Sequence, residues 1–350
     1  MENTSFDIII VGAGTAGASF ARMIDSEKYK VLLIDASEKK PKVCAGLLSD
    51  SAQKILARYG TVLPKEVITH PQHFSVRVTD LSDGYTKYYR RNYINTDREK
   101  LDGYIRSLVP STVTVARGVV NSIEAGACGY TVRLADGTRS FSSKYIVGAD
   151  GGSSAVRREL FPKKKIFKYT AIQEWYRASG IEPYYACLFD NETSSGSSWV
   201  FFKDELAVFG GAFPRKDPRG AFEKQKKKIR RLGILNAETL DNPIKVEACS
   251  LSRPRGLSGI FLGGGGAFLI GEAAGLITPD SFEGISFALA SAEALSKALN
   301  KSPRRALGIY RKGCARLRLK ILFRSIKRPF MYNKALRRLV MKSGFTALKR

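Results

Sequence analysis

The chain has 350 residues, of which 44% are hydrophobic, and its 58 Lys and Arg against 32 Asp and Glu give a formal net charge of +26. This length and composition allow a large buried core, which excludes an intrinsically disordered protein and predicts one or two globular domains. A charge of this size is typical of proteins that bind nucleic acid, an anionic membrane or an acidic ligand.

The cysteines argue against a disulfide framework and against a metal centre. All five are widely spaced and form no CxxC pair (Cys44, Cys128, Cys187, Cys249, Cys314). We therefore expect a reducing, cytoplasmic environment and no metal site. The N-terminus shows no secretory signal pattern, and the most apolar stretch, residues 256–277, is interrupted by glycines. We accordingly expect no membrane-spanning helix.

The first motif is a glycine-rich loop near the N-terminus. An apolar run, residues 8–11, predicts a buried strand of a parallel sheet, and a stretch compatible with a helix follows the loop. The loop has the GxGxxG spacing, in which glycines allow a tight turn and let the backbone approach a pyrophosphate at the helix N-terminus. Its candidate binding residues are Gly12, Ala13, Gly14, Ala16 and Gly17.

A second predicted strand, KVLLID, ends in Asp35 and is followed by Ala36. An acid at this distance from the glycine loop can accept hydrogen bonds from a ribose. GxGxxG alone is weak evidence, and an ordinary glycine turn is the alternative. The order of strand, loop, helix, strand and acid favours a dinucleotide site.

Three later motifs relate the chain to a known superfamily. Arg98 begins a predicted helix, Asp150 and Gly151 follow an apolar strand in GADGGSSAVRR, and Gly271 and Glu272 lie in GEAAG. With these motifs the chain resembles the flavoproteins that include aromatic hydroxylases, flavin halogenases and geranylgeranyl reductases. The resemblance implies one FAD, with the arginine near the flavin and the acid of the last motif on the ribityl chain.

Glu272 stands where that superfamily usually has aspartate. Its extra methylene moves the carboxylate by about 1.5 Å, so the expected contact requires a small backbone shift. The alternative is an acid that stabilises a helix N-terminus.

Further stretches resemble the geranylgeranyl reductase branch. PKVCAGLLSD resembles its K.CGG loop, with Cys44 kept and Ala45 in place of a glycine. SSWVFF resembles its Y.W.FP element through Trp199 and Phe201, with Ser197 at the tyrosine position. A third stretch, residues 274–288, resembles the run that places a helix N-terminus at the flavin; its candidate residues are Phe282, where the family has glycine, Gly284 and Ile285.

This branch implies reduction of an isolated alkene, for which reduced flavin supplies hydride from N5 and a nearby acid supplies a proton. Cys44 is the candidate proton donor or positioning group, and a small buried thiol is the alternative. Trp199, Phe201 and Phe282 are the candidate wall for a prenyl chain; ordinary sheet packing is the alternative for the first two. The ring of Phe282 could narrow the space over the flavin.

The predicted fold is α/β: a Rossmann-like FAD-binding domain of the glutathione reductase type, an inserted antiparallel β-sheet substrate domain and a basic helical C-terminal tail. The FAD-binding domain is assigned to residues 1–70, 95–165 and 255–300, and the substrate domain to 71–94 and 166–254, with a hairpin in the first insert. No second GxGxxG follows a strand. Electrons would therefore come from NADPH bound transiently or from a protein such as ferredoxin.

The tail, residues 301–350, contains 17 Lys or Arg and no Asp or Glu. Apolar residues at helical spacing predict two basic helices separated at Pro329. One face could close the core while the other meets an anionic membrane; a solvated basic face is the alternative. The tail lacks the pattern of a nucleic-acid-binding segment, since few aromatic residues alternate with its charges.

We therefore expect an FAD-dependent reductase that acts on a prenyl or similarly lipophilic alkene. The same FAD motifs would serve a monooxygenase that hydroxylates a small aromatic compound. A flavin-binding protein without catalysis is the third reading, because the chain departs from the family at Ser197, Glu272 and Phe282.

Overall fold

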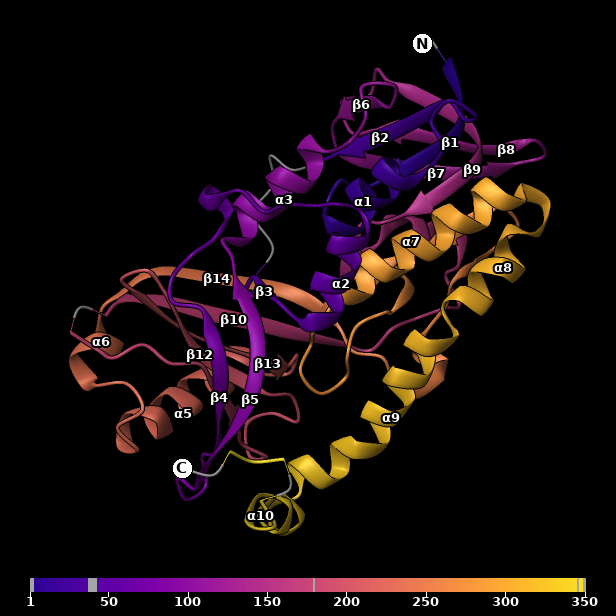
Figure 1. The fold of residues 1–350 in the computed structure, drawn as a ribbon. Helices are drawn as coiled ribbons and strands as arrows, with labels where there is room; N and C mark the ends of the chain where they lie inside the picture. Colours follow the sequence, from indigo (N-terminus) through magenta and orange to yellow (C-terminus); the bar gives the residue numbers. More distant parts are fainter. Residues whose placement is uncertain (1–2, 37–42, 179, 345, 349–350) are drawn as a thin grey trace.

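The computed structural model describes residues 3–36, 43–178, 180–344 and 346–348. These residues form two β-sheets, each accompanied by helices, with a further run of helices along one side (Figure 1). The fold is mixed α/β with a parallel sheet, as the glycine-loop motif and the flavoprotein resemblance predicted.

The first sheet has a parallel centre in the order β16-β9-β1-β2-β6. Its strands are β1 (Asn3–Val11), β2 (Val31–Asp35), β6 (Thr114–Arg117), β9 (Ser140–Gly148) and β16 (Ala267–Leu269). The antiparallel strands β7 (Val120–Gly126), β8 (Gly129–Leu134) and β15 (Gly263–Gly264) extend it. Ile8, Ile9 and Ile10 of β1 are fully buried, because strands lie on both sides of β1 and its side chains pack above and below.

Helices cover this sheet and connect it to the rest of the chain. They are α1 (Thr15–Met23), α2 (Asp50–Arg58), α3 (Arg98–Ser107), α4 (Ala155–Leu160) and α7 (Ile285–Lys301). The helices α1 and α7 lie side by side although some 260 residues separate them (Figure 1). Short 3-10 helices are η1 (Lys65–Val67), η2 (Gly151–Ser153), η3 (Gly256–Gly259), η4 (Gly271–Ala274) and η5 (Pro303–Arg305).

The second sheet has the order β14-β10-β13-β12-β11-β4-β5-β3. Its strands are β3 (Leu47–Leu48), β4 (His73–Asp80), β5 (Thr86–Asn95), β10 (Lys168–Arg177), β11 (Ala186–Phe189), β12 (Ser198–Lys203), β13 (Leu206–Pro214) and β14 (Pro243–Ser252). The predicted hairpin is present as β4 and β5. Helices α5 (Pro218–Arg231) and α6 (Ala237–Asp241) accompany the sheet, and Phe222 of α5 packs on Phe209 and Phe213.

The prediction that this sheet is antiparallel throughout is wrong at one junction. The strands β11 and β4 pair in parallel, with Ala186 opposite Arg77 and Phe189 opposite Asp80. A tight hairpin forces two strands to run in opposite directions, but no hairpin joins these two strands. The chain passes through the first sheet between them, so their relative direction is free of that constraint.

The C-terminal region forms α8 (Ala306–Gly313), α9 (Ala315–Tyr332) and α10 (Lys334–Lys342). The predicted break at Pro329 is wrong, because Pro329 lies inside the last turn of α9. There a proline costs one backbone hydrogen bond, and the side chain of Tyr332 holds the turn by donating to the carbonyl of Asp280 at 3.0 Å. The break comes at Asn333, whose Oδ1 accepts from the N–H of Leu336 and caps α10.

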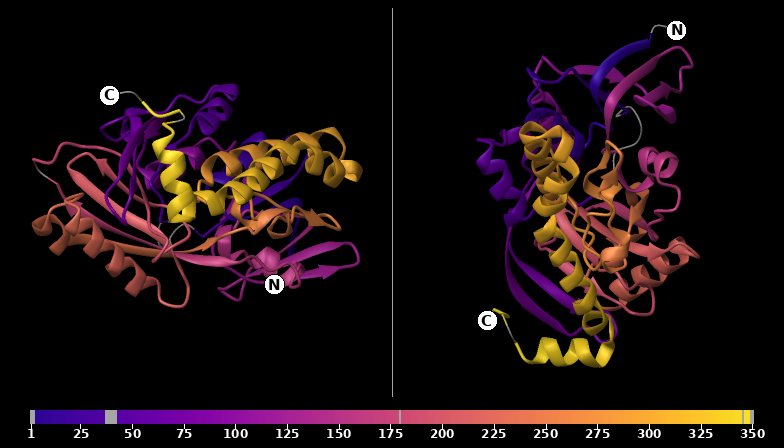
Figure 2. Two further views of the ribbon diagram at one scale, coloured as in Figure 1. Left: turned by 90° about the horizontal axis from the view of Figure 1, so that it is seen from below. Right: turned by 90° about the vertical axis from the view of Figure 1, so that its right-hand side faces the viewer.

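Figure 2 shows α9 running along the side of the molecule to the end where α10 lies across it. Within the described ranges, none of the helices is both long enough and apolar enough to cross a membrane.

A buried ion pair fastens α10 to the second sheet. The side chains of Arg337 and Asp80 are 0% and 1% exposed, and their closest nitrogen and oxygen atoms are 2.7 Å apart. Burial disfavours the charged carboxylate, but hydrogen bonds from Arg337 outweigh this and hold the pKa of Asp80 below its usual value. Arg337 also donates to the carbonyl of Met331 at 2.9 Å, so one guanidinium joins α9, α10 and β4.

We expect Arg337→Met to lower the free energy of unfolding by about 3–5 kcal/mol, because it leaves the Asp80 carboxylate buried without its cation. Because the folded-state pKa of Asp80 is lowered, the contribution is complete at neutral pH and is lost as the pH falls below about 4. Urea denaturation at pH 7 and at about pH 3 measures both effects. The control is Arg338→Met, which breaks the half-exposed pair with Asp83 and should cost less than about 1 kcal/mol. Equal losses in the two variants would contradict this role.

Candidate functional site

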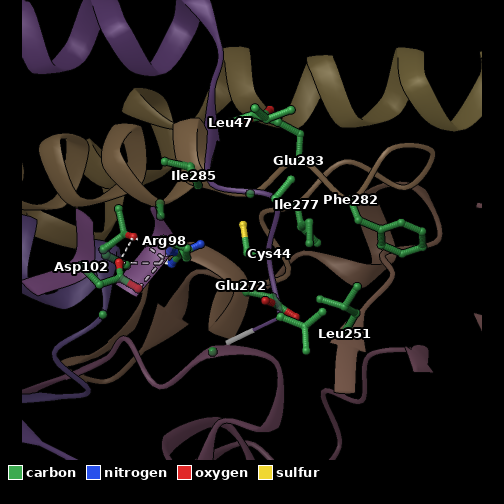
Figure 3. A pocket seen from close by; sticks show the side chains of 18 of the residues that line it. Cys44, Leu47, Arg98, Asp102, Leu251, Glu272, Ile277, Phe282, Glu283 and Ile285 are labelled. Atoms are coloured by element: carbon green, nitrogen blue, oxygen red, sulfur yellow. Dashed lines mark hydrogen bonds and ion pairs between the residues drawn. The ribbon is translucent and has the colours of Figure 1, made fainter. Parts of the chain in front are cut away.

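A cavity of about 540 Å³ lies between the two sheets, a size typical of small-molecule sites. The N-terminal glycine loop, the end of β2, helix α3, strand β12 and the segment before α7 all contribute to its wall. Most predicted site residues line it: Gly12, Ala13, Gly14, Ala16, Asp35, Ala36, Cys44, Ala45, Arg98, Asp150, Gly151, Trp199, Glu272, Phe282, Gly284 and Ile285. Gly17, Phe201 and Gly271 are not among the lining residues. Figure 3 shows part of this wall, with Cys44 between Arg98 and Ile277.

The glycines of the first loop serve different structural purposes. Gly12 has φ +103°, and a Cβ on Gly17 would lie 1.8 Å from the carbonyl oxygen of Gly12. Gly17 therefore allows α1 to pack directly on the loop, which explains why it lies behind the cavity wall. A Cβ on Gly14 would meet no protein atom of the described chain within 4 Å. Gly14 is also the N-cap of α1 and supplies no side-chain cap, so the helix N-terminus opens toward the cavity.

Asp35 lies where β2 ends, on the cavity wall. The guanidinium of Arg106 lies 3.9 Å from its carboxylate, and the backbone carbonyl of Asp35 accepts from Gly118 at 2.9 Å. The carboxylate is therefore held at the end of the strand next to the glycine loop, as a ribose-binding acid would be.

Arg98 is fixed by a network that the sequence analysis missed. Its Nε donates to Asp102 at 2.9 Å, its Nη2 donates to the hydroxyl of Thr15 at 3.1 Å, and Thr15 donates to Asp102 at 2.7 Å. Burial disfavours the charge on Asp102, but Arg98 and Thr15 outweigh it and lower the pKa of the carboxyl. The network joins α3 to α1. The i, i+4 spacing of Arg98 and Asp102 on one helix was the signal that could have revealed it.

Asp150 caps a helix from inside the cavity wall. Its Oδ2 accepts from the N–H groups of Ala155 and Val156, at 2.6 and 3.2 Å, which places it at the start of α4. Burial raises the pKa of the carboxyl. Its Oδ1 is buried and has no hydrogen-bond partner among the residues that the structure describes. One oxygen is thus structural, and the other remains available to a ligand.

Glu272 has a protein partner within the cavity wall. One carboxylate oxygen accepts from the N–H of Ser252 at 2.7 Å, which ties η4 to the end of β14. The added methylene therefore brings this oxygen to a neighbouring strand. A Cβ on Gly152 would lie 2.4 Å from the same oxygen, so the glycine makes room for the longer side chain.

Cys44 lies in the cavity beside the Arg98 network. Its sulfur accepts from the N–H of Gly46 at 3.4 Å, and it interacts with the guanidinium of Arg98. The thiol is half-buried and forms no disulfide bond with another cysteine of the described chain. Lys42 of the stretch that resembles K.CGG lies outside the described residues.

Strand β12 contributes Trp199 to the cavity but not Phe201. The two side chains lie on the same face of the strand, since their positions differ by two. The ring of Phe201 is fully buried further from the cavity, next to the ammonium of Lys203. The prediction that it forms part of the cavity wall is therefore wrong. The indole of Trp199 lies against Gly210 of β13, where a Cβ would be 2.6 Å from its nitrogen.

Phe282 lines the cavity, but its ring packs away from Cys44 (Figure 3). It contacts the ring of Tyr169, with centroids 5.8 Å apart, and fills the space above Gly196. The ring therefore does not occupy the space beside Cys44. Its φ of +54° lies in the left-handed region, so the backbone keeps the conformation that a glycine would adopt there.

Residues outside the sequence motifs also line the cavity. Tyr93, Tyr185 and Cys187 form one side, and burial raises the pKa of all three groups. They come from β5, from the residue before β11 and from β11 itself. No local pattern marks them, because they come together only through the pairing of β11 with β4 and of β4 with β5.

A buried lysine holds the residues at the end of β5, where Thr96 donates to the carbonyl of Gly46 in the loop that carries Cys44. Lys203 donates to Asn95 and to the carbonyl of Thr96, at 2.7 and 2.5 Å, and burial lowers its pKa to about 8. No cluster of potential metal ligands occurs among the described residues.

Comparison with known proteins places the chain in a family. It is 37% identical over 350 residues to Protein CbrA of Escherichia coli O9:H4 (strain HS), covering 97% of this chain and 93% of the relative. The chain belongs to the CbrA family. The family model described as "Lycopene cyclase protein" matches residues 7–170 of this CbrA-family member.

Two solved structures share the CbrA-family fold described above. A geranylgeranyl bacteriochlorophyll reductase-like protein from Thermoplasma acidophilum superposes with a TM-score of 0.79 at 19% identity, covering 97% of this chain and 91% of that one. PqsL, a probable FAD-dependent monooxygenase from Pseudomonas aeruginosa, superposes with a TM-score of 0.73 at 17% identity, covering 97% and 100%. The chain therefore has the fold of these proteins.

The glycine loop gives a matched pair of substitutions. We expect Gly17→Ala to lower the free energy of unfolding by at least about 2 kcal/mol, since its Cβ would overlap the carbonyl of Gly12. Gly14→Ala should cost less than about 1 kcal/mol, because its Cβ points into open space. Urea denaturation of ligand-free protein measures both values. Similar losses in the two variants would show that the loop does not pack in this way.

Proposed function

We propose that the chain is an FAD-dependent oxidoreductase that reduces a C=C bond of a prenyl or similarly lipophilic substrate. The observation that carries this proposal is one continuous cavity, which extends from the N-terminal glycine loop to Cys44, Trp199 and the start of α7. A dinucleotide such as FAD, whose flavin ring lies far from its adenosine, suits this arrangement. A short nucleotide would use only one end of it.

Several features of the cavity suit FAD. The open space at Gly14 and the N-terminus of α1 suit a pyrophosphate, and Asp35 suits a ribose. The Oδ1 of Asp150, which has no hydrogen-bond partner within the described part of the chain, offers an acceptor or, when protonated, a donor. On this proposal the first sheet is a Rossmann-like domain of the glutathione reductase type. Support also comes from PqsL, which has this fold and is named as probably FAD-dependent.

The start of α7 suits the flavin ring. Gly284 is its N-cap and carries no side chain, while Ile285 forms the adjoining wall. The positive end of a helix dipole stabilises negative charge that develops nearby. The carboxylate of Glu272 lies in the same wall and would orient the chain between ring and phosphate.

Bound FAD, once reduced by NADPH or a ferredoxin-like protein, would supply hydride to one alkene carbon. Cys44 is the residue that we assign to protonation of the other carbon, with Arg98 holding the thiol in position. Trp199, Tyr93 and Tyr185 would enclose the apolar substrate and exclude water. The similarity in fold to the geranylgeranyl bacteriochlorophyll reductase-like protein supports a reductase reaction.

Monooxygenation of a small aromatic compound is the second candidate. The aromatic residues of the cavity wall favour this reaction, since Tyr93, Tyr185 and Trp199 could stack on the ring of an aromatic substrate. The similarity in fold to PqsL supports the same reading.

The cofactor proposal predicts a specific loss of affinity. Gly14→Val should raise the dissociation constant for FAD at least tenfold, because its side chain fills the open space at the α1 N-terminus. Titration of ligand-free protein with FAD, followed by flavin fluorescence, measures this. The control is Gly308→Val on the exposed side of α8, which should leave affinity unchanged. A folded wild-type protein that binds no FAD would refute the proposal.

The catalytic proposal predicts a loss of turnover at Cys44. Under anaerobic conditions with dithionite and geranylgeranyl diphosphate, the wild type should form products that gain two hydrogens per reduced double bond. Cys44→Ala should lower kcat at least about a hundredfold, as expected for loss of a general acid. Cys128→Ala, at an exposed turn, is the matched control and should retain full turnover.

The same assay distinguishes the alternatives. If Cys187→Ala abolishes turnover and Cys44→Ala does not, the proton donor is Cys187. Formation of an oxygenated aromatic product in air with NADPH would favour monooxygenation instead. Bound FAD that never changes redox state with any substrate would indicate a binding protein without catalysis.

A further inference from the structure

Helix α9 carries an apolar stripe on its outer surface. We use this name for Leu319, Phe323, Ile326 and Phe330, whose exposed fractions are 50%, 68%, 57% and 48%. The spacing of four, three and four residues places all four on one face of the helix. Contiguous exposed apolar surface of this kind marks an interaction site, whereas isolated exposed residues are common.

The stripe cannot turn into the protein core, because the opposite face of α9 is fixed there. Ile321 is fully buried, and Arg324 forms an ion pair with Asp280 at 3.0 Å. The hydrogen bond from Tyr332 to the carbonyl of Asp280 fixes the far end of the helix. The structure thus holds α9 with its apolar stripe directed outward.

Basic side chains accompany the stripe. Arg316 and Lys327 are exposed, and by helical spacing they lie along one flank of the stripe together with the half-buried Lys320. The whole of 301–350 has no acidic residue. An amphipathic helix with apolar and basic faces of this type lies in the interface of a membrane that contains anionic lipids.

We propose that the apolar stripe and its basic flank dock this protein on the surface of a bilayer rich in anionic lipids. Charge decides between a bilayer and a second copy of the chain. Two copies facing each other through α9 would bring like charges together, whereas anionic headgroups would neutralise them. Helix α10 carries further exposed apolar side chains, Leu336, Leu339 and Val340, which are 37%, 67% and 37% exposed.

Docking would leave helix α9 between the bilayer and part of the cavity wall. Arg324 binds Asp280, and the ammonium of Lys320 lies 4.0 Å from Glu283. Both acids belong to the segment before α7, of which Ser281, Phe282 and Glu283 line the cavity. The inference itself does not depend on flavin binding or on the reaction proposed above.

Vesicle sedimentation tests the docking. The full-length protein should sediment with vesicles of equal parts phosphatidylcholine and phosphatidylglycerol, and at least tenfold more weakly with phosphatidylcholine alone. Binding should weaken as NaCl rises, because salt screens the basic flank. Phe323→Ser should weaken binding to the mixed vesicles about tenfold or more, as loss of one inserted aromatic side chain predicts. Phe74→Ser on β4 is the matched control, since Phe74 is 72% exposed and lies outside α9 and α10.

A fluorescence measurement gives an independent readout. In Phe323→Trp the new indole should shift to shorter wavelength with the mixed vesicles, and lipids brominated on their acyl chains should quench it. Phe74→Trp should show neither change beyond the signal of the native Trp175 and Trp199. Circular dichroism establishes that each variant is folded.

Three outcomes would overturn the proposal. The first is absence of binding to the mixed vesicles. The second is equal binding by the Phe323→Ser variant and the wild type. The third is a concentration-dependent dimer in sedimentation velocity that Phe323→Ser abolishes while vesicle binding is unchanged, which would identify a second copy of the chain as the occupant.

Discussion

The close packing of helix α1 on the N-terminal loop is the constraint on which the site depends. Gly17 lets the helix reach the carbonyl of Gly12, and this contact fixes where the helix N-terminus points. Thr15, in the first turn of the same helix, then meets Asp102 and Arg98 of α3. The position of Arg98, and with it the surroundings of Cys44, therefore follows from a glycine that lies outside the cavity wall.

The two sheets contribute different kinds of surface to this site. The parallel sheet offers strand ends and helix N-termini, which are suited to phosphate and ribose groups. The second sheet offers flat faces with large side chains, such as Trp199 and Tyr93, which are suited to an apolar or aromatic ligand. Segments between sheets, above all the one that carries Cys44, bring the two kinds of surface together.

The sequence predicted the parts whose signals are local. Apolar runs, glycine spacing and the acid after the second strand identified β1, α1, β2 and Asp35, because each depends on its own few residues. It missed Asp102, Tyr185 and Cys187, whose roles depend on contacts between distant elements. The wrong placement of Phe201 has the same origin, since alternation gives the face of a strand but not how far along it a cavity extends. At Pro329 the tertiary contact of Tyr332 outweighed the local preference for a break.

The left-handed backbone at Phe282 affects how the cavity can change shape. A non-glycine residue there costs backbone energy, and packing against Tyr169 and Arg253 must compensate for it. Arg253 also donates to the carbonyls of Ser195 and Pro279, so the same buried guanidinium holds two neighbouring segments. With glycine at position 282 there would be no aromatic ring to displace, so the segment could move at a lower cost. In this chain any movement of the segment must first remove an aromatic side chain from its packing. A molecule bound in this cavity would therefore meet a largely preformed wall.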